Sequence, residues 1–198
     1  MRRQEKGFTL IEALIAMALL ILLISLGAPS YATWIRNNQI RTAAESILNG
    51  LQLARSEAIK RNSLVRFQLV SDLTNGCTIS STGTSWVVSL DSAASSCAAT
   101  GSDTVAPRII QKRSNQEGSA ATSVSATLTG GSSASVVFDS FGRVQTSSLA
   151  SSISSINISI AGATAGTYRD LRIAIAPGGR IIMCDPAVTA TGDTRLCP

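Results

Sequence analysis

The first twelve residues, MRRQEKGFTLIE, hold the side chains with the clearest chemical consequence in this chain. Three cations precede Gly7, and Phe8 then opens an apolar run to Leu26 that is interrupted by a single acid, Glu12. The run is about 19 residues long, close to the roughly 20 that a helix needs to cross a bilayer. A carboxylate at the centre of a bilayer costs about 2.5–3.5 kcal/mol, so Glu12 requires a functional explanation. The chemistry open to it is an ion pair, which is stronger at low dielectric than in water.

The order of basic residues, Gly7, Phe8 and Glu12 resembles the class III signal of type IV prepilins. This resemblance implies that prepilin peptidase cleaves between Gly7 and Phe8, that the Phe8 amine is N-methylated, and that Glu12 governs assembly into a filament. A secretory signal peptide should instead end in a small-residue A-x-A-like site, which the Gly-Ala-Pro sequence at 27–29 fits poorly. An ordinary membrane anchor would explain the length of the apolar run but not Glu12.

The composition argues against catalysis. Histidine is absent, which excludes His-based triads, His general bases and mixed His/Cys zinc sites. Four acids of the later chain lie near predicted turns and strand edges, where solvated acids are ordinary: Asp139, Asp170, Asp185 and Asp193. Without a strand–Gly loop–helix context, the two glycines at 178–179 are expected to form a hairpin turn and not a phosphate cradle. We therefore expect no enzymatic activity, no cofactor and no metal site.

The net charge of +5 includes three cations and one acid within the first seven residues, which leaves about +3 for the rest of the chain. This mild excess does not by itself indicate a nucleic-acid partner. Aromatic residues make up only 4% of the chain, which argues against an array of base-stacking platforms.

Four cysteines lie beyond the apolar run, at positions 77, 97, 184 and 197. An even number of cysteines beyond a membrane-targeting segment indicates an oxidising compartment and two disulfides. Of the possible pairings we prefer the sequential one, Cys77–Cys97 and Cys184–Cys197, because both loops are short and local. Each bond would stabilise the fold by about 2–4 kcal/mol. Free thiols are the alternative.

A long helix and a β-rich domain must position these residues. The helix is predicted from Phe8 to about Arg61, because apolar residues recur at intervals of three and four beyond Pro29. The members of this stripe are Ile40, Ala44, Ile47, Leu51, Ala54 and Ala58. Runs of β-branched and aromatic residues then predict strands. These runs are 64–70, 85–90, 123–128, 134–138, 156–161, 169–176 and 180–184.

Polar Ser/Thr/Gly joints such as 80–85, 130–133 and the Pro-Gly-Gly at 177–179 predict turns between these strands. The Ser-rich region 114–155 is expected to contain strands with solvated faces, because apolar residues recur within it. The chain is therefore divided into four parts. They are a leader at 1–7, a membrane-spanning or filament-core half of the helix at 8–28, an amphipathic half at 29–62 and a head domain at 63–198.

Three internal segments resemble the GspH/FimT branch of pilin-like proteins, namely 51–62 (LQLARSEAIKRN), 136–144 (VVFDSFGRV) and 178–186 (GGRIIMCDP). The resemblance implies an α+β fold in which a long N-terminal helix packs on an antiparallel β-sheet or β-sandwich head. It also implies a single-pass inner-membrane protein with a periplasmic head, which an inner-membrane platform inserts into a filament. The implied partners are prepilin peptidase/N-methyltransferase, the platform, and other minor and major pilins.

That branch includes minor pilins of type IV pili and minor pseudopilins of type II secretion. The Cys-bounded tail at 184–197 looks more like the pilin side, so we favour a minor pilin that primes assembly or joins the pilus tip. Some FimT proteins also bind DNA in natural transformation through a C-terminal G-R-x-R motif. Here residues 179–182 read Gly-Arg-Ile-Ile, so only the first arginine, Arg180, is present. Other cations that could contact phosphate are Arg169, Arg172, Arg195, Arg108, Lys112 and Arg113.

Overall fold

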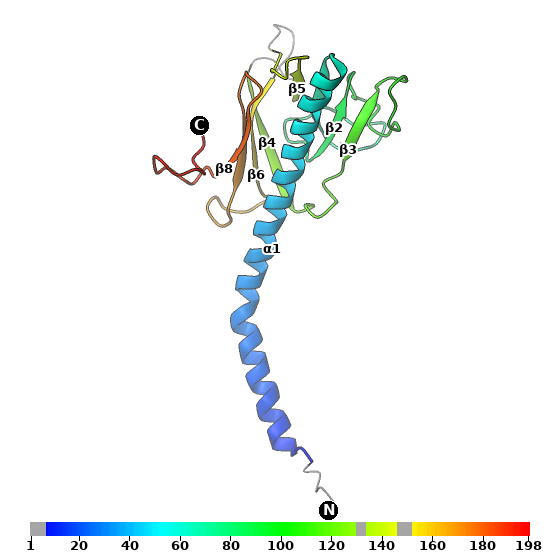
Figure 1. The fold of residues 1–198 in the computed structure, drawn as a ribbon. Coiled ribbons are helices and arrows are strands. Elements are labelled where there is room, and N and C mark those ends of the chain that lie inside the picture. Colours follow the sequence, from blue (N-terminus) through cyan, green and yellow to red (C-terminus); the bar gives the residue numbers. More distant parts are fainter. Residues whose placement is uncertain (1–6, 130–133, 146–151) are drawn as a thin grey trace, which may run out of the picture. The chain divides into compact units, whose positions relative to one another are not determined.

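The computed structural model describes residues 7–129, 134–145 and 152–198, with the backbone alone at 26–29 (Figure 1). Within these residues, helix α1 (Leu10–Arg61) is followed by strands β1 to β8. The chain divides into two compact units, Met1–Ile35 and Arg36–Pro198. Residues 1–6 of the predicted leader and the predicted turn at 130–133 lie outside the described residues.

Helix α1 begins and ends where the sequence supplies caps. The Thr9 hydroxyl, just before the helix, accepts a hydrogen bond from the Glu12 N–H at 3.3 Å, as the side chain of an N-cap residue does. At the other end, Asn62 has a left-handed backbone conformation with a φ of 47°. The N–H groups of Asn62 and Ser63 donate to the carbonyls of Ile59 and Ala58 at 3.3 and 3.2 Å, which is a Schellman motif. The helix end predicted near Arg61 is therefore confirmed.

The strands form two antiparallel sheets of four strands each. The first sheet has the order β3-β2-β1-β5, with bounds Ile109–Arg113, Ser85–Ser89, Val65–Val70 and Ser135–Phe138. The second has the order β4-β6-β7-β8, with bounds Thr122–Thr129, Ser152–Ile160, Leu171–Ile175 and Ile181–Cys184. All seven predicted runs overlap a strand, and the turn at 177–179 joins β7 to β8, so the expected α+β fold is confirmed. Strand β3, with the sequence IIQKR, was not predicted, and it lies at a sheet edge where charged side chains are common.

The apolar stripe of α1 lies in the main core. All six predicted members are buried, and they join the inner faces of both sheets in one cluster. Gly50 allows the closest approach, because a Cβ there would meet Phe67 Cε2 at 2.9 Å and Trp86 Cδ2 at 3.1 Å. The Trp86 indole N–H donates to the Ser46 hydroxyl at 3.0 Å, which fixes the ring against the helix. The first sheet therefore packs directly on the α1 backbone at position 50.

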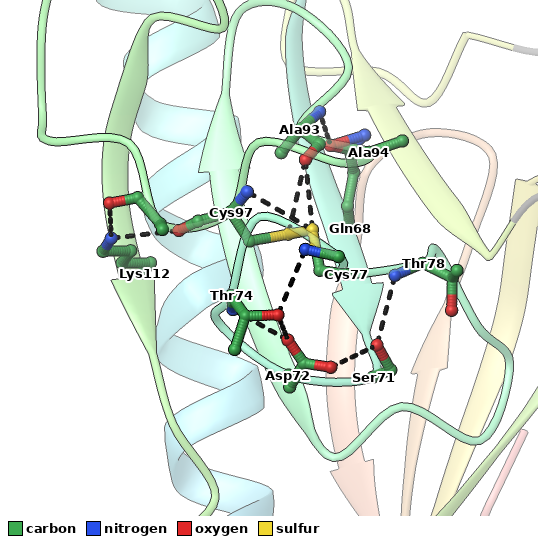
Figure 2. The surroundings of a disulfide bond; sticks show 12 residues. Gln68, Ser71, Asp72, Thr74, Cys77, Thr78, Ala93, Ala94, Cys97 and Lys112 are labelled. Carbon is green, nitrogen blue, oxygen red and sulfur yellow. Dashed lines mark hydrogen bonds between the residues drawn. A yellow bond between two sulfur atoms is a disulfide. The ribbon is translucent and has the colours of Figure 1, made fainter.

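A second, smaller core lies on the outer face of the first sheet, around one disulfide (Figure 2). Its buried members come from β1, β2, β3 and two loops: Val70, Cys77, Val87, Ala93, Cys97 and Ile109. The buried Gln68 side chain accepts a hydrogen bond from the Ala93 N–H at 2.8 Å. Lys112 donates to the carbonyls of residues 97, 98 and 99 at 2.9, 2.9 and 3.0 Å. These bonds satisfy backbone groups of the loop that would otherwise lack partners.

Candidate functional site

The N-terminal unit presents an apolar surface. In the described chain, every large apolar side chain from Phe8 to Ile24 is exposed, and Phe8 itself is 81% exposed. Helix α1 is long and apolar enough to cross a membrane by length and composition. Monomeric soluble proteins rarely expose so large a continuous apolar surface, because water is a poor solvent for it. This surface therefore requires lipid or apolar neighbours.

Glu12 lies in the first turn of α1, within this apolar surface. Its side chain is exposed, and its carboxylate makes no hydrogen bond or ion pair with the residues that the structure describes. The positive end of the helix dipole favours a carboxylate at this position. The Gly7–Phe8 peptide bond lies just before the helix in exposed, non-helical backbone. The Glu12 carboxylate and the Gly7–Phe8 peptide bond are thus both accessible from outside the chain.

Two aromatic residues follow on the same helix. The rings of Tyr31 and Trp34 are stacked, with centroids 5.8 Å apart and an interplanar angle of 23°. They are 64% and 59% exposed. This pair was not predicted from the sequence, although a spacing of three residues places two side chains on one face of a helix.

On the second sheet, the structure brings two of the predicted arginines to one face. Arg172 on β7 pairs in register with Cys184, and the Ala176 N–H bonds to the Arg180 carbonyl at 2.9 Å. Because alternate residues of paired strands share a face, Arg172 and Arg180 both project away from the core. They are separated by four positions of the ladder, or about 13 Å.

The two arginines differ in their contacts. The Arg172 Nε donates to the Asn157 side-chain oxygen at 2.6 Å. Arg180 is exposed, makes no hydrogen bond or ion pair through its side chain within the described chain, and lines an open pocket of about 210 Å³. Arg169 is also exposed, and its backbone N–H donates to the Asn37 side chain at 2.9 Å. Arg180 is thus the member best placed to meet an external anion.

Arg195 is occupied by a neighbouring acid. Its Nε and Nη2 donate to the Asp193 carboxylate at 3.1 and 2.7 Å. These hydrogen bonds lower the pKa of Asp193 to about 2 and raise the pKa of Arg195. Burial, and then the charge of Asp185, raise the pKa of Asp170. This group of acids disfavours phosphate near Arg195.

The remaining predicted cations belong to the first sheet and already have partners. Arg108 forms two hydrogen bonds with Asp91, at 2.8 and 2.7 Å. Arg113 forms an ion pair with Glu117 at 2.9 Å, and Lys112 holds the three carbonyls of the second core. These cations therefore do not converge with Arg172 and Arg180.

Gly179, which precedes Arg180, has a packing role of its own. Its φ is +82°, and a Cβ at this position would overlap the Gly142 carbonyl oxygen. That carbonyl accepts a hydrogen bond from the Arg55 Nε at 3.1 Å. The Val144 N–H bonds to the Pro177 carbonyl at 3.0 Å. The β7–β8 hairpin thus packs against the turn after β5, and a side chain at position 179 would separate them.

Both disulfides of the sequential pairing are present. Cys77 is joined to Cys97 and Cys184 to Cys197, with Cα–Cα distances of 6.1 and 5.1 Å. The first lies in the second core, and the second ties the C-terminal tail to the end of β8. The tail is also held by a hydrogen bond from the Asp185 N–H to the Arg195 carbonyl at 2.8 Å.

Comparison with known proteins gives two sequence matches. The family of type II transport protein GspH matches residues 43–179, and the prokaryotic N-terminal methylation motif matches residues 2–28. No curated protein matches the chain. A crystal structure of the type IV minor pilin FimU of Pseudomonas aeruginosa is similar with a TM-score of 0.47 and 19% identity, over 74% of this chain and 88% of that one. A second crystal form of FimU gives 0.44 and 18%, over 72% and 90%.

Proposed function

The chain belongs to the family of type II transport protein GspH, whose members are pilin-like proteins, and we propose that it is a minor pilin of a type IV pilus. In this role it primes pilus assembly or forms part of the tip complex. The observation that carries the proposal is the exposed apolar surface from Phe8 to Ile24, with Glu12 as its single charge. The methylation motif that matches residues 2–28 supports it.

The proposed maturation follows from the residues around Gly7. The chain would sit in the inner membrane with its basic leader, residues 1–7, on the cytoplasmic side, where cations are retained. Prepilin peptidase would cleave after Gly7 and methylate the new amine of Phe8. The cysteine-containing head would lie in the periplasm, an oxidising compartment that permits both disulfides.

The proposed assembly step uses the Glu12 carboxylate. In a filament, the apolar helices of neighbouring subunits bundle, and Glu12 pairs with the Phe8 amine of a neighbour. An ion pair in such a low-dielectric bundle is stronger than in water, and a misaligned neighbour would leave the carboxylate without a partner. Glu12 would thereby set the register between subunits. The inner-membrane platform and other minor and major pilins are the partners that this step requires.

The experiment compares two acids on the same helix. In cells that assemble the filament, Glu12→Ala should leave the amount of chain in the inner membrane unchanged and reduce its amount in sheared filaments by more than about tenfold, because a buried amine is left unpaired. Glu45→Ala is the matched control, since Glu45 is exposed and its one ion pair among the described residues is with Arg41 at 2.8 Å. Normal incorporation of the Glu12 variant would contradict the proposal.

DNA binding for natural transformation is a second candidate, favoured by Arg172 and Arg180 on one face of the second sheet. DNA affinity should be measured across a salt series with the head, residues 36–198, which forms a compact unit with its own core. Arg180→Ala should reduce the salt slope by about one unit, whereas Arg195→Ala should change it less because Asp193 already pairs with Arg195. Absence of binding at low salt would remove this candidate.

A minor pseudopilin of type II secretion is the third candidate, favoured by the family description itself. Both roles use the same membrane insertion and the same assembly acid. Copurification distinguishes the two roles. A minor pilin should be recovered from sheared pili, whereas a minor pseudopilin should copurify with the secretion platform.

A further inference from the structure

The longest stretch of α1 without a charged residue extends well beyond Leu26, where the apolar run ends. Between Glu12 and Arg36 the chain has no charged residue over about 23 positions, which is about 34 Å of helix at 1.5 Å per residue. The hydrocarbon core of a bilayer is about 30 Å thick. The length of the stretch Ala13–Ile35 therefore matches the thickness of the hydrocarbon core with little helix tilt. A charged residue flanks it at each end, Glu12 before it and Arg36 after it.

One end of this stretch carries an interfacial pair. Tyr31 and Trp34 are stacked on each other and exposed. Such rings, apolar in body and polar at one atom, concentrate at the headgroup level of bilayers. The residues that follow are polar: Arg36, Asn37 and Asn38. The aromatic pair thus marks where the helix leaves the hydrocarbon.

The other end of the stretch is set by the start of the helix. Helix α1 begins at Leu10. The Ala13 N–H donates a hydrogen bond to the Thr9 carbonyl at 3.2 Å, and this bond closes the first turn of the helix. Helix geometry leaves the N–H groups of Leu10 and Ile11 without intrahelical partners. Backbone groups without partners are not tolerated in the hydrocarbon, so this turn belongs at the polar surface. Glu12 is only two residues, or about 3 Å of rise, from Leu10.

We propose that the membrane-embedded segment is Ala13–Ile35, held at the periplasmic headgroups by Tyr31 and Trp34, so that Glu12 lies in the cytoplasmic headgroup layer before assembly. This inference rests on the proposed membrane insertion and shifts the periplasmic boundary from residue 28, as predicted from the sequence, to Ile35. Glu12 then remains hydrated until assembly moves the helix out of the membrane into the filament. Its carboxylate loses water only where the Phe8 amine of a neighbouring subunit takes the place of that water. The Gly7–Phe8 bond lies outside the hydrocarbon, where a peptidase can reach it.

The depth of Trp34 tests the periplasmic end. The full chain is reconstituted in phosphatidylcholine vesicles brominated either near the headgroup or near the chain end, and tryptophan quenching is compared. Trp34→Phe is the control, because it leaves only Trp86, which is 3% exposed within the head. We expect strong quenching of Trp34 by the bromine near the headgroup. If the embedded segment ended at residue 28, Trp34 would lie about 9 Å beyond the hydrocarbon, and neither lipid would quench it strongly.

Thiol labelling tests the cytoplasmic end. The native cysteines are in disulfides, so a cysteine introduced by Glu12→Cys or Leu20→Cys is the reactive thiol of its variant. In inside-out membrane vesicles, an impermeant maleimide should label the Glu12→Cys variant at least about tenfold faster than the Leu20→Cys variant, because water is absent from the hydrocarbon.

The outcomes separate the inference from the proposed function. Headgroup quenching of Trp34 together with fast labelling of Glu12→Cys supports the inference. The inference is overturned if both introduced thiols are protected from the maleimide. It is also overturned if Trp34 is not quenched while the Leu20→Cys thiol is protected. In both cases membrane insertion itself still holds. Rapid labelling of Leu20→Cys would overturn insertion itself and the inference with it.

Discussion

The two halves of α1 share one backbone conformation and differ in everything that surrounds it. Before residue 25, the large apolar side chains of the described helix are exposed. After residue 39, the apolar stripe is buried against two sheets, and Leu51 is 0% exposed. The helical state is therefore compatible with either environment. What differs between the halves is the distribution of apolar side chains around the axis.

The first half is apolar on all sides and built largely of Leu and Ile, as is usual for a helix surrounded by lipid or by other helices. The second half has one apolar stripe, rich in alanine, and Gly50 on the side of Phe67 and Trp86. Small residues let a sheet approach closely, so this half is specific for its own head. The comparison shows that the chain supplies a partner for one half and leaves the partner of the other to its surroundings.

The largest expected effect comes from removing matched leucines from the two halves. Leu51→Ala should lower the free energy of unfolding of the head by about 2–5 kcal/mol, because it opens a cavity between helix and sheets. Leu20→Ala should leave it unchanged, because that side chain is 56% exposed and lies outside the head core. Chemical denaturation of the full chain in detergent, followed by Trp86 fluorescence in a Trp34→Phe background, measures both. Equal destabilisation by the two variants would contradict the division between the halves.

The second core offers the next way to test how the head is stabilised. Replacing both Cys77 and Cys97 by alanine should cost about 3 kcal/mol, from a less restricted unfolded chain and lost packing. Cys184 and Cys197 enclose a shorter loop, with a sequence separation of 13 against 20, so the same replacement there should cost slightly less. Calorimetry of the oxidised proteins would compare them. A larger loss at the tail would mean that the tail contributes more to stability than the second core does.

Periodicity and composition predicted much of this fold, and particular residues show why. The stripe from Ile40 to Ala58 and the hairpin at 177–179 were predictable, because local spacing and turn residues determine them. The second core was not predicted, since it depends on Gln68 and Lys112 meeting backbone groups of loops far along the chain. Strand β3 was not predicted because Lys112 and Arg113 leave it without the run of β-branched and aromatic residues that marks the other strands.

The candidate site was predicted to a lesser degree. Gly7, Phe8 and Glu12 stand out in the sequence because one acid interrupts an apolar run. That Arg195 is paired while Arg180 is not could not be read from spacing, since it depends on the Asp193 carboxylate, which binds Arg195. The packing role of Gly179 likewise depends on Gly142, which is distant in the sequence.

Gly179 provides a smaller test, confined to the head. Gly179→Ala should cost about 2 kcal/mol more than Gly162→Ala, because only the first variant adds a clash with the Gly142 carbonyl to the strain of a positive φ. Gly162 has a φ of +73° with no atom within 4 Å of its Cβ position, so it isolates the strain alone. Thermal unfolding of the two variants gives the difference. Equal costs would show that the hairpin shifts to accommodate the methyl group.

The smallest expected effects come from acids of the head, which lie among polar groups, whereas Glu12 lies in an apolar surface. The pKa of Asp193 is lowered from 3.8 to about 2 by its hydrogen bonds with Arg195. The stability that this pair contributes is therefore present above pH 3.8 and is lost as the pH falls toward 2. Asp193→Asn should then destabilise the head slightly at neutral pH.

Asp170 should show the opposite sign, because burial, and then the charge of Asp185, raise the pKa of its carboxyl group. Its ionised form is disfavoured in the folded state, so its contribution to stability is present below its unfolded pKa and is lost as the pH rises through its folded pKa. Asp170→Asn should therefore stabilise the head at neutral pH and have no such effect at about pH 3, where the carboxyl is protonated in both states. Urea midpoints of the two Asn variants at both pH values measure this. Because both acids keep contact with water, their effects should stay small, and a large effect at either would mean that the head holds that acid away from solvent.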